Sequence, residues 1–355
     1  MVRRMGERET KQARVHAVLD AAGLDAIVLR DPANLAWYLG GARVHVVPGE
    51  PIAELTVARH AEELRTSAIE APRLAAEELG ADAPPLAASP WWEPLGPDAD
   101  ASTGSDRPRG GERDVADDLM AARSDLTEPE VERYRALCRD TAAAAGAALR
   151  EAQPRDTEFG LAGRAARRLY EREIEPIVLL VAGEARLPLH RHPLPTVAPL
   201  GARTMLVVCG RRHGLISAVT RMRAFSPLTT AERATYAGLL AVEAAYLDAT
   251  APGVRVGDIV AAGAAAYAEH GFAPDEWHAH HQGGPNGYTT RDYLASPSTD
   301  HVAVERQAFA WNPSAGGFKV EDTVLASADG VEVLSPDPAW PSVAVAGRQR
   351  PDVLA

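Results

Sequence analysis

The alternation of helix and strand patterns in the second half of the chain constrains the fold most strongly. Thr127-Glu-Pro-Glu130 has the form of a capping box and predicts a long helix after it. Two apolar runs, 204–210 and 214–222, are separated by so few residues that they predict a hairpin. Helices combined with antiparallel strands predict an α+β fold. The other expected elements are a helix starting near 156–158, helices from 229 or 230 to 252 and over 258–270, and strands at 176–183, 308–313, 318–327 and 331–335.

The first half predicts a smaller α/β domain. A helical pattern over 13–22 ends at Gly23, and a buried strand follows at 24–29. Residues 31–41 form a turn that leads into another element, and 69–80 has the pattern of an amphipathic helix. Residues 83–114 are rich in Pro, Gly, Asp and Ser and hold one apolar island, Trp91–Trp92, so we expect part of this stretch to be a long surface loop. We therefore expect two domains, 1–122 and 123–355.

Charge and cysteine content exclude several classes of function. The chain has 37 Lys plus Arg and 49 Asp plus Glu, so the net charge is 37 − 49 = −12. An acidic chain without a basic run is a poor partner for nucleic acid or an anionic membrane surface. No stretch approaches the roughly 20 apolar residues of a spanning helix, and the charged N-terminus does not resemble a signal peptide. Two cysteines, Cys138 and Cys209, suit a reducing compartment, so we expect a cytoplasmic protein.

The segment HAHHQGGPNGY, residues 278–288, has the composition of a metal site. It places His278, His280 and His281 just before two adjacent glycines, which let the backbone approach a ligand closely. Histidines alone do not complete a site for hard divalent ions. The decisive question is therefore whether carboxylates elsewhere in the chain can join them.

The second half resembles the creatinase and aminopeptidase P family, which has the pita-bread fold. The markers occur in order: a buried strand before His190 and His192, a hairpin ending in Thr220-Arg221, a helix closed by Pro252-Gly253, the histidine–glycine cluster, and Glu321-Asp322-Thr323 before Gly330. GLDAIVLRDPANLAWYLGG in the first half resembles the small N-terminal domain of these proteins. The resemblance implies a C-terminal pita-bread domain and a smaller creatinase-type α/β domain.

Peptidase-type members of that family hold two divalent metals with two Asp, one His and two Glu. The resemblance places the first Asp on strand 204–210, which contains none, and the second at Ala218. The His position matches His281, or His280 if the register shifts by one. The two Glu positions carry Asn312 and Glu321. A two-metal site needs bridging carboxylates to offset its charge, so we expect no metal and no other cofactor.

Most candidate site residues also have a structural interpretation. His280 and His281 act as acid or base, or merely shape a glycine-rich turn; Glu321 binds a cation, orients a histidine or pairs with Lys319. The resemblance implies a substrate-contacting histidine at His190 or His192, which the sequence does not separate. The remaining substrate-binding candidates are Arg291, which can also be salt-bridged, Asn312, Trp311, which can also be core, and Lys319, expected on the same strand face as Glu321 and Thr323.

Three functions follow from this pattern. The first is a metal-independent hydrolase of the creatinase type, which cleaves a C–N bond in a small amino-acid-derived or guanidine-like metabolite with a histidine acid/base. The second is an inactive relative that binds a ligand or protein. The third is a metal-dependent Xaa-Pro aminopeptidase with atypical ligands. The resemblance also implies a homodimer, to which Trp91–Trp92 offers a contact.

Overall fold

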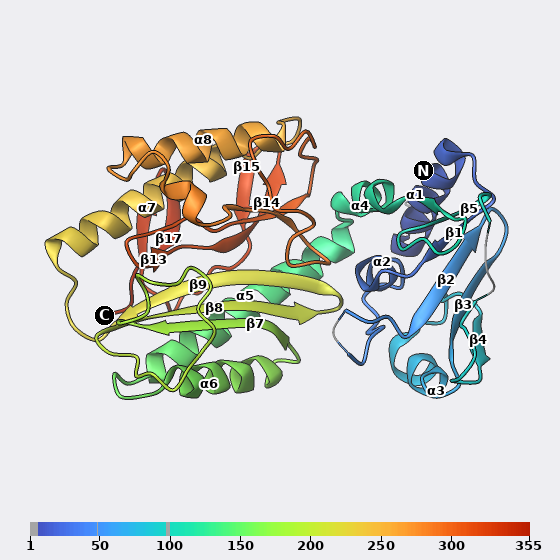
Figure 1. Cartoon of the computed structure of the whole chain (residues 1–355), viewed down its shortest axis with the longest axis horizontal. Helices are drawn as coiled ribbons and strands as arrows, with labels where there is room; N and C mark the ends of the chain where they lie inside the picture. The colour runs from blue at the N-terminus through green and yellow to red at the C-terminus, as the bar shows by residue number, and fades with distance from the viewer. Residues whose placement is uncertain (1–5, 48, 97–99) are drawn as a thin grey trace. The chain divides into compact units, whose positions relative to one another are not determined.

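The computed structural model describes residues 6–47, 49–96 and 100–355, which form two compact units. The first ends at Pro129 and the second begins at Glu130. Figure 1 shows both units, coloured along the chain. Within the described residues, no helix combines the length and apolar character needed to cross a membrane.

The first unit is a six-stranded mixed sheet with helices. Its strand order is β4-β3-β2-β1-β5-β6. The strands are β1 Ala26–Leu29, β2 Ala53–Ala58, β3 Glu62–Ser67, β4 Leu86–Ser89, β5 Thr103–Ser105 and β6 Arg113–Asp114. The helices are α1 Glu7–Ala22, α2 Pro32–Tyr38, α3 Ala71–Arg73 with a π turn η1 at Leu74–Glu78, and α4 Ala116–Ser124.

The described parts of the stretch 83–114, which are 83–96 and 100–114, contain three short strands as well as loops. They supply β4, β5 and β6, and β5 pairs in parallel with β1 in the middle of the sheet. These strands are two to four residues long, so none presents the alternation of apolar and polar residues that reveals a longer strand. Trp91 and Trp92 remain 66% and 68% exposed, and their rings meet edge to face.

The second unit is α+β, as predicted. Its helices are α5 Glu128–Glu151, α6 Glu158–Tyr170, α7 Thr230–Ala249 and α8 Val256–Glu269, with a 3-10 turn η2 at Glu276–Ala279. One sheet contains β7 Glu175–Gly183, β8 Arg203–Arg212 and β9 Leu215–Ala224. A second has the order β10-β11-β14-β15, with β10 Gly283–Asn286, β11 Ala308–Trp311, β14 Asp322–Ser327 and β15 Gly330–Val333. Two hairpins complete the unit: β12 Ser314–Ala315 with β13 Phe318–Lys319, and β16 Ser342–Val345 with β17 Arg348–Pro351.

Local sequence explains the central hairpin and the helix after it. The β8–β9 turn is His213-Gly214, and both residues have positive φ, as a two-residue turn between twisted strands requires. Thr229 caps α7 in a capping box with Glu232. A bridge between Thr220 and Glu321 joins β9 to the segment between β13 and β14. This bridge brings the two larger sheets of the unit together at Thr220 and Glu321.

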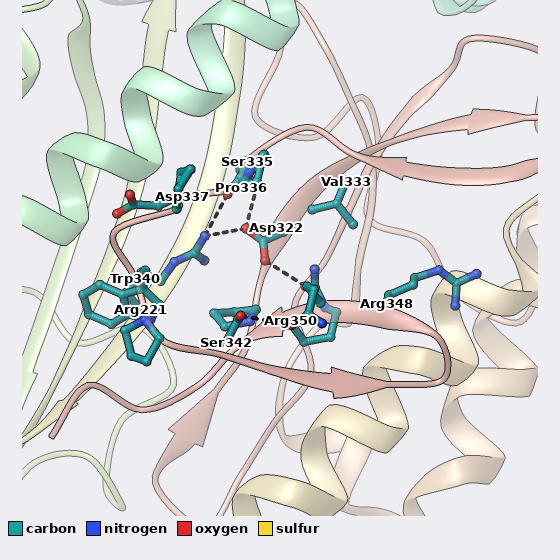
Figure 2. A pocket seen from close by; sticks show the side chains of 14 residues that line it. Arg221, Asp322, Val333, Ser335, Pro336, Asp337, Trp340, Ser342, Arg348 and Arg350 are labelled. Atoms are coloured by element: carbon teal, nitrogen blue, oxygen red, sulfur yellow. Dashed lines mark hydrogen bonds and ion pairs between the residues drawn. The ribbon is translucent and has the colours of Figure 1, made fainter.

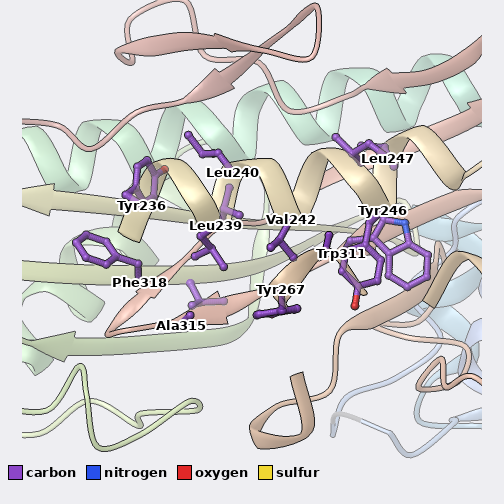
Figure 3. Close-up of a cluster of buried hydrophobic side chains, with 14 of the residues drawn as sticks. Tyr236, Leu239, Leu240, Val242, Tyr246, Leu247, Tyr267, Trp311, Ala315 and Phe318 are labelled. Carbon is purple, nitrogen blue, oxygen red and sulfur yellow. The ribbon is translucent and has the colours of Figure 1, made fainter. Parts of the chain in front are cut away.

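The main core of the second unit lies between α7, α8 and the strands. Figure 3 shows the side chains of α7 packed against Trp311, Tyr267 and Phe318. The Tyr246 and Trp311 rings stack with centroids 5.0 Å apart. Burial of these large apolar side chains holds β11 and β13 in place, and with them the polar residues Asn312 and Lys319 at their ends.

Candidate functional site

Three histidines from two distant segments converge in the second unit. His192 lies between β7 and β8, whereas His280 and His281 follow η2. The Nε2 atoms of His192 and His280 are 2.9 Å apart, the rings of His280 and His281 stack with centroids at 4.5 Å, and the His192 and His281 rings are 5.1 Å apart. His190 is exposed, and no contact of its side chain to the cluster is recorded among the described residues. His192 therefore belongs to the cluster.

Neighbouring residues hold both segments in place. Arg191 donates to Ser314 Oγ at 3.2 Å and to Glu276 Oε1 at 2.5 Å, which ties the His192 loop to β12 and η2. A Cβ on Gly283, whose φ is +106°, would collide with the Ala310 carbonyl, so only glycine lets this backbone lie so close to β11. Sequence reasoning missed Arg191, although its place between two histidines was a signal.

Glu321 is buried and already has partners. Its Oε1 accepts from Arg291 Nη2 at 2.6 Å, and its Oε2 accepts from Thr220 Oγ1 at 2.8 Å. Burial opposes ionisation of Glu321, but the positive charges of Lys319 and Arg291 outweigh that effect and lower its pKa. Arg291 is thus the salt-bridge partner of Glu321. Thr220 was not among the predicted site residues, although its strand alternation with Ala218 would have indicated it.

The other candidates differ in their environment. Trp311 is fully buried in the core and donates its indole N–H to Thr250 Oγ1 at 2.9 Å, so it packs rather than faces the histidines. Asn312 is 2% exposed, and its side-chain Oδ1 has no hydrogen-bond partner within the part of the chain described. Lys319 is 3% exposed, and burial is the first cause that lowers its pKa.

The surroundings of the three histidines favour their neutral form. Burial, followed by the charges of Arg291 and Lys319, lowers the pKa of His281 to about 4. Burial and Lys319 depress the pKa of His280 further and also lower that of His192. His281 is therefore unprotonated in the resting site and can accept a proton, although a pKa near 4 makes it a weaker base than a free imidazole and its imidazolium a stronger acid.

The residues present do not fit a two-metal centre. Cys209 and Ala218 lie opposite each other in β8 and β9 and form an apolar cluster with Ile216 and Ala310. Strand 204–210 and Ala218, where the resemblance places the two aspartates, therefore offer no carboxylate. Only Glu321 remains, and its oxygens accept from Arg291 and Thr220. No bridging carboxylate is left to offset two dications.

A single ion at the histidines meets a different obstacle. One nitrogen from each of His192, His280 and His281 lies within 4.8 Å of the others, which is compatible with a three-imidazole site. However, the cations Arg291 and Lys319 both lower the pKa of His281, and only the Glu321 carboxylate acts in the opposite direction, so positive charge exceeds negative charge beside these rings. That excess opposes a dication as it opposes a proton.

A cavity of about 400 Å³ lies behind the Glu321 strand segment. Because side chains alternate along a strand, Asp322 points away from the side that Glu321 faces. Figure 2 shows Asp322 bound by Arg221, Ser335 and Arg350, at 2.8, 2.6 and 2.8 Å. The Arg350 guanidinium also donates to Glu243 at 2.7 Å. These charges compensate one another, so we interpret the network as structural.

Comparison with known proteins places this geometry in a family. Residues 132–328 match the sequence model of metallopeptidase family M24. The putative dipeptidase YkvY of Bacillus subtilis (strain 168) is 27% identical over 131 residues, which is 35% of this chain and 36% of that relative's length.

Solved structures share the fold over nearly the whole chain. The prolidase of Pyrococcus horikoshii OT3 superposes with a TM-score of 0.77 at 18% identity, covering 92% of this chain and 98% of its own. The N-terminal domain of FACT complex subunit SPT16 from chickpea has a TM-score of 0.68 at 14% identity, covering 93% and 96%. The predicted pita-bread fold and hydrolase-type family are thereby confirmed. The chain belongs to metallopeptidase family M24.

Proposed function

We propose that this protein is a metal-independent hydrolase that cleaves a C–N bond in a small, polar, amino-acid-derived metabolite. The observation that carries the proposal is the convergence of three neutral histidines beside Glu321, Arg291 and Lys319, while Cys209 and Ala218 form an apolar cluster. Such a site supplies proton transfer and fixed positive charge from side chains alone.

His281 is the general base in this proposal. It is less buried than His280, its pKa is about 4, and it is neutral at pH 7. It accepts a proton from the attacking water, and the resulting imidazolium returns that proton to the leaving nitrogen. His192, which is exposed at the edge of the cluster, contacts the substrate. Glu321 positions the Arg291 guanidinium rather than binding a substrate cation, which favours amino-acid derivatives over guanidine-like compounds.

The experiment compares His281→Ala with His270→Ala after chelator treatment, on a panel of N-acyl amino acids and dipeptides that includes Xaa-Pro. His270 caps the end of α8 and is exposed, so its variant is the matched control. We expect His281→Ala to lose about 10²–10⁴-fold in kcat with little change in stability, since proton transfer is typically worth that much. Unchanged turnover in His281→Ala would refute the assignment of the base.

A binding module is the second candidate. The likeness to the SPT16 N-terminal domain supports it, because that structure shares this fold and comes from a subunit of a complex. No turnover across the panel, together with measurable ligand binding, would favour this candidate over the hydrolase.

Assembly and location complete the proposal. We propose a homodimer that uses the exposed Trp91–Trp92 pair, since large exposed apolar side chains mark contact surfaces. We also propose a cytoplasmic location, because Cys138 and Cys209 are free and buried, as suits a reducing compartment.

A further inference from the structure

The candidate site contains a lysine whose side chain is almost wholly buried and whose ammonium group makes no ion pair or hydrogen bond with the described residues. Lys319 is 3% exposed. Among the described residues, its Nζ has no hydrogen-bond acceptor and no carboxylate oxygen within 4.0 Å, and the nitrogen itself is not fully enclosed by protein atoms, so a small ligand can reach it. Burial of an unpaired charge is costly unless a ligand or a partner compensates it. The position therefore needs an explanation beyond packing.

The use of lysine here is unusual for this chain. Of its 37 cationic residues, 35 are arginines, and the only lysines are Lys11 and Lys319. Lys11 is paired: its Nζ donates to Glu7 and to the Trp37 carbonyl, at 2.6 Å each. A lysine offers a compact charge with three donors on a flexible stem, which suits a small anion approached from different directions.

Strand geometry directs Lys319 into the histidine site. It pairs across the β12–β13 hairpin with Ser314, whose hydroxyl accepts from Arg191, the neighbour of His192. The two-residue period places Lys319 on the same side as Glu321. Its charge also contributes to lowering the pKa of all three clustered histidines, so the ammonium lies within electrostatic range of each ring.

The charges of the site leave one positive charge uncompensated. Arg291 pairs with Glu321, and Arg191 pairs with Glu276. Lys319 also interacts electrostatically with Glu321, but makes no ion pair with it, so the five groups together carry one more positive than negative charge. We propose that the site takes a ligand with a single negative charge, and that Lys319 binds its carboxylate. This inference rests on the proposed function and narrows its substrate class to small monocarboxylates such as N-acyl amino acids.

Calorimetry and NMR test the inference on the full chain. The probes are N-acetylglycine and its neutral analogue N-acetylglycinamide, titrated into wild type, Lys319→Met, Lys319→Arg and the control Arg167→Met. Arg167 is 75% exposed on α6, so its variant removes one positive charge away from the site. We expect wild type and the control to bind N-acetylglycine and not the amide. Lys319→Met should bind at least about 30-fold more weakly, with partial recovery in Lys319→Arg.

Wild type labelled with ¹⁵N-lysine keeps the test decisive if Lys319→Met does not fold. The two lysines give two side-chain signals, and Lys11 is the internal reference. The Lys319 signal should shift with N-acetylglycine and not with the amide. Equal binding of both probes, or an unmoved Lys319 signal, would overturn the inference. Carboxylate binding through Lys319 without any turnover would leave this inference intact and refute the hydrolase. Turnover with an unchanged KM in Lys319→Met would support the hydrolase and refute the role of Lys319.

Discussion

Acidification should destabilise the second unit through His281. The ordinary histidine pKa is 6.5, and the folded surroundings lower it to about 4. Because the folded pKa is depressed, the unfolded chain takes up the proton first as the pH falls. The stabilisation is therefore present above pH 6.5 and is lost as the pH falls through about 4.

The magnitude follows from the shift. A difference of about 2.5 pKa units at about 1.36 kcal/mol each gives a ceiling near 3.4 kcal/mol. The His281 ring is only partly buried, so solvent screening reduces this to about 1–2 kcal/mol. His280, whose pKa is lowered in the same direction, adds to the effect.

The assay is urea unfolding of wild type and His281→Gln at pH 7 and pH 4.5. Both cysteines are buried in the second unit, so their reaction with dithiodipyridine reports the unfolding of that unit. Wild type should lose about 1–2 kcal/mol more free energy of unfolding than the variant between the two pH values. Equal losses would show that His281 is not held neutral by its surroundings, and the reasoning about its field would fail.

Three further predictions concern single positions. Glu321→Gln should cost about 3–5 kcal/mol of stability at pH 7 by the same thiol assay, because it leaves the buried charge of Arg291 uncompensated; a loss below about 1 kcal/mol would contradict the pairing. Gly263→Ala in α8 should lower the free energy of unfolding by about 1–3 kcal/mol, because the new Cβ would collide with the aromatic ring of Tyr246 in α7. The control Gly163→Ala in α6 meets open space, so it should leave thermal stability unchanged or raise it. If the proposed homodimer forms, replacement of Trp91–Trp92 by serines should give a monomer in light scattering, and a wild type that is already monomeric would refute the proposal.

The elements of the second unit could be predicted because their signals are local. The helix that starts after Thr127, the turn at His213-Gly214 and the cap at Thr229 each follow from a few adjacent residues. The strands within 83–114 could not be predicted, because they are too short to show periodicity and owe their pairing to the rest of the sheet.

The candidate site was predictable in membership but not in its interactions. The sequence suggested His280, His281 and Glu321, but the choice of His192 over His190 depends on how a loop folds back onto η2. The pairing of Glu321 with Arg291 rather than Lys319 joins segments 30 residues apart, and no spacing rule predicts it. The lowered pKa of His281 likewise arises from burial and from charges brought in by other strands.

Metal analysis of the purified protein tests the central claim most directly. Protein is prepared without chelator, incubated with Mn²⁺, Co²⁺ and Zn²⁺, and desalted. It should then retain well below one equivalent of metal per chain and show no metal-stimulated Xaa-Pro cleavage. The reasons are that Glu321 alone remains of the four carboxylates of a two-metal site, and that positive charge exceeds negative charge beside the histidines. Two retained equivalents would contradict the account and restore a conventional metallopeptidase. One equivalent that His281→Ala releases would contradict it as well, and would identify His192, His280 and His281 as a metal centre.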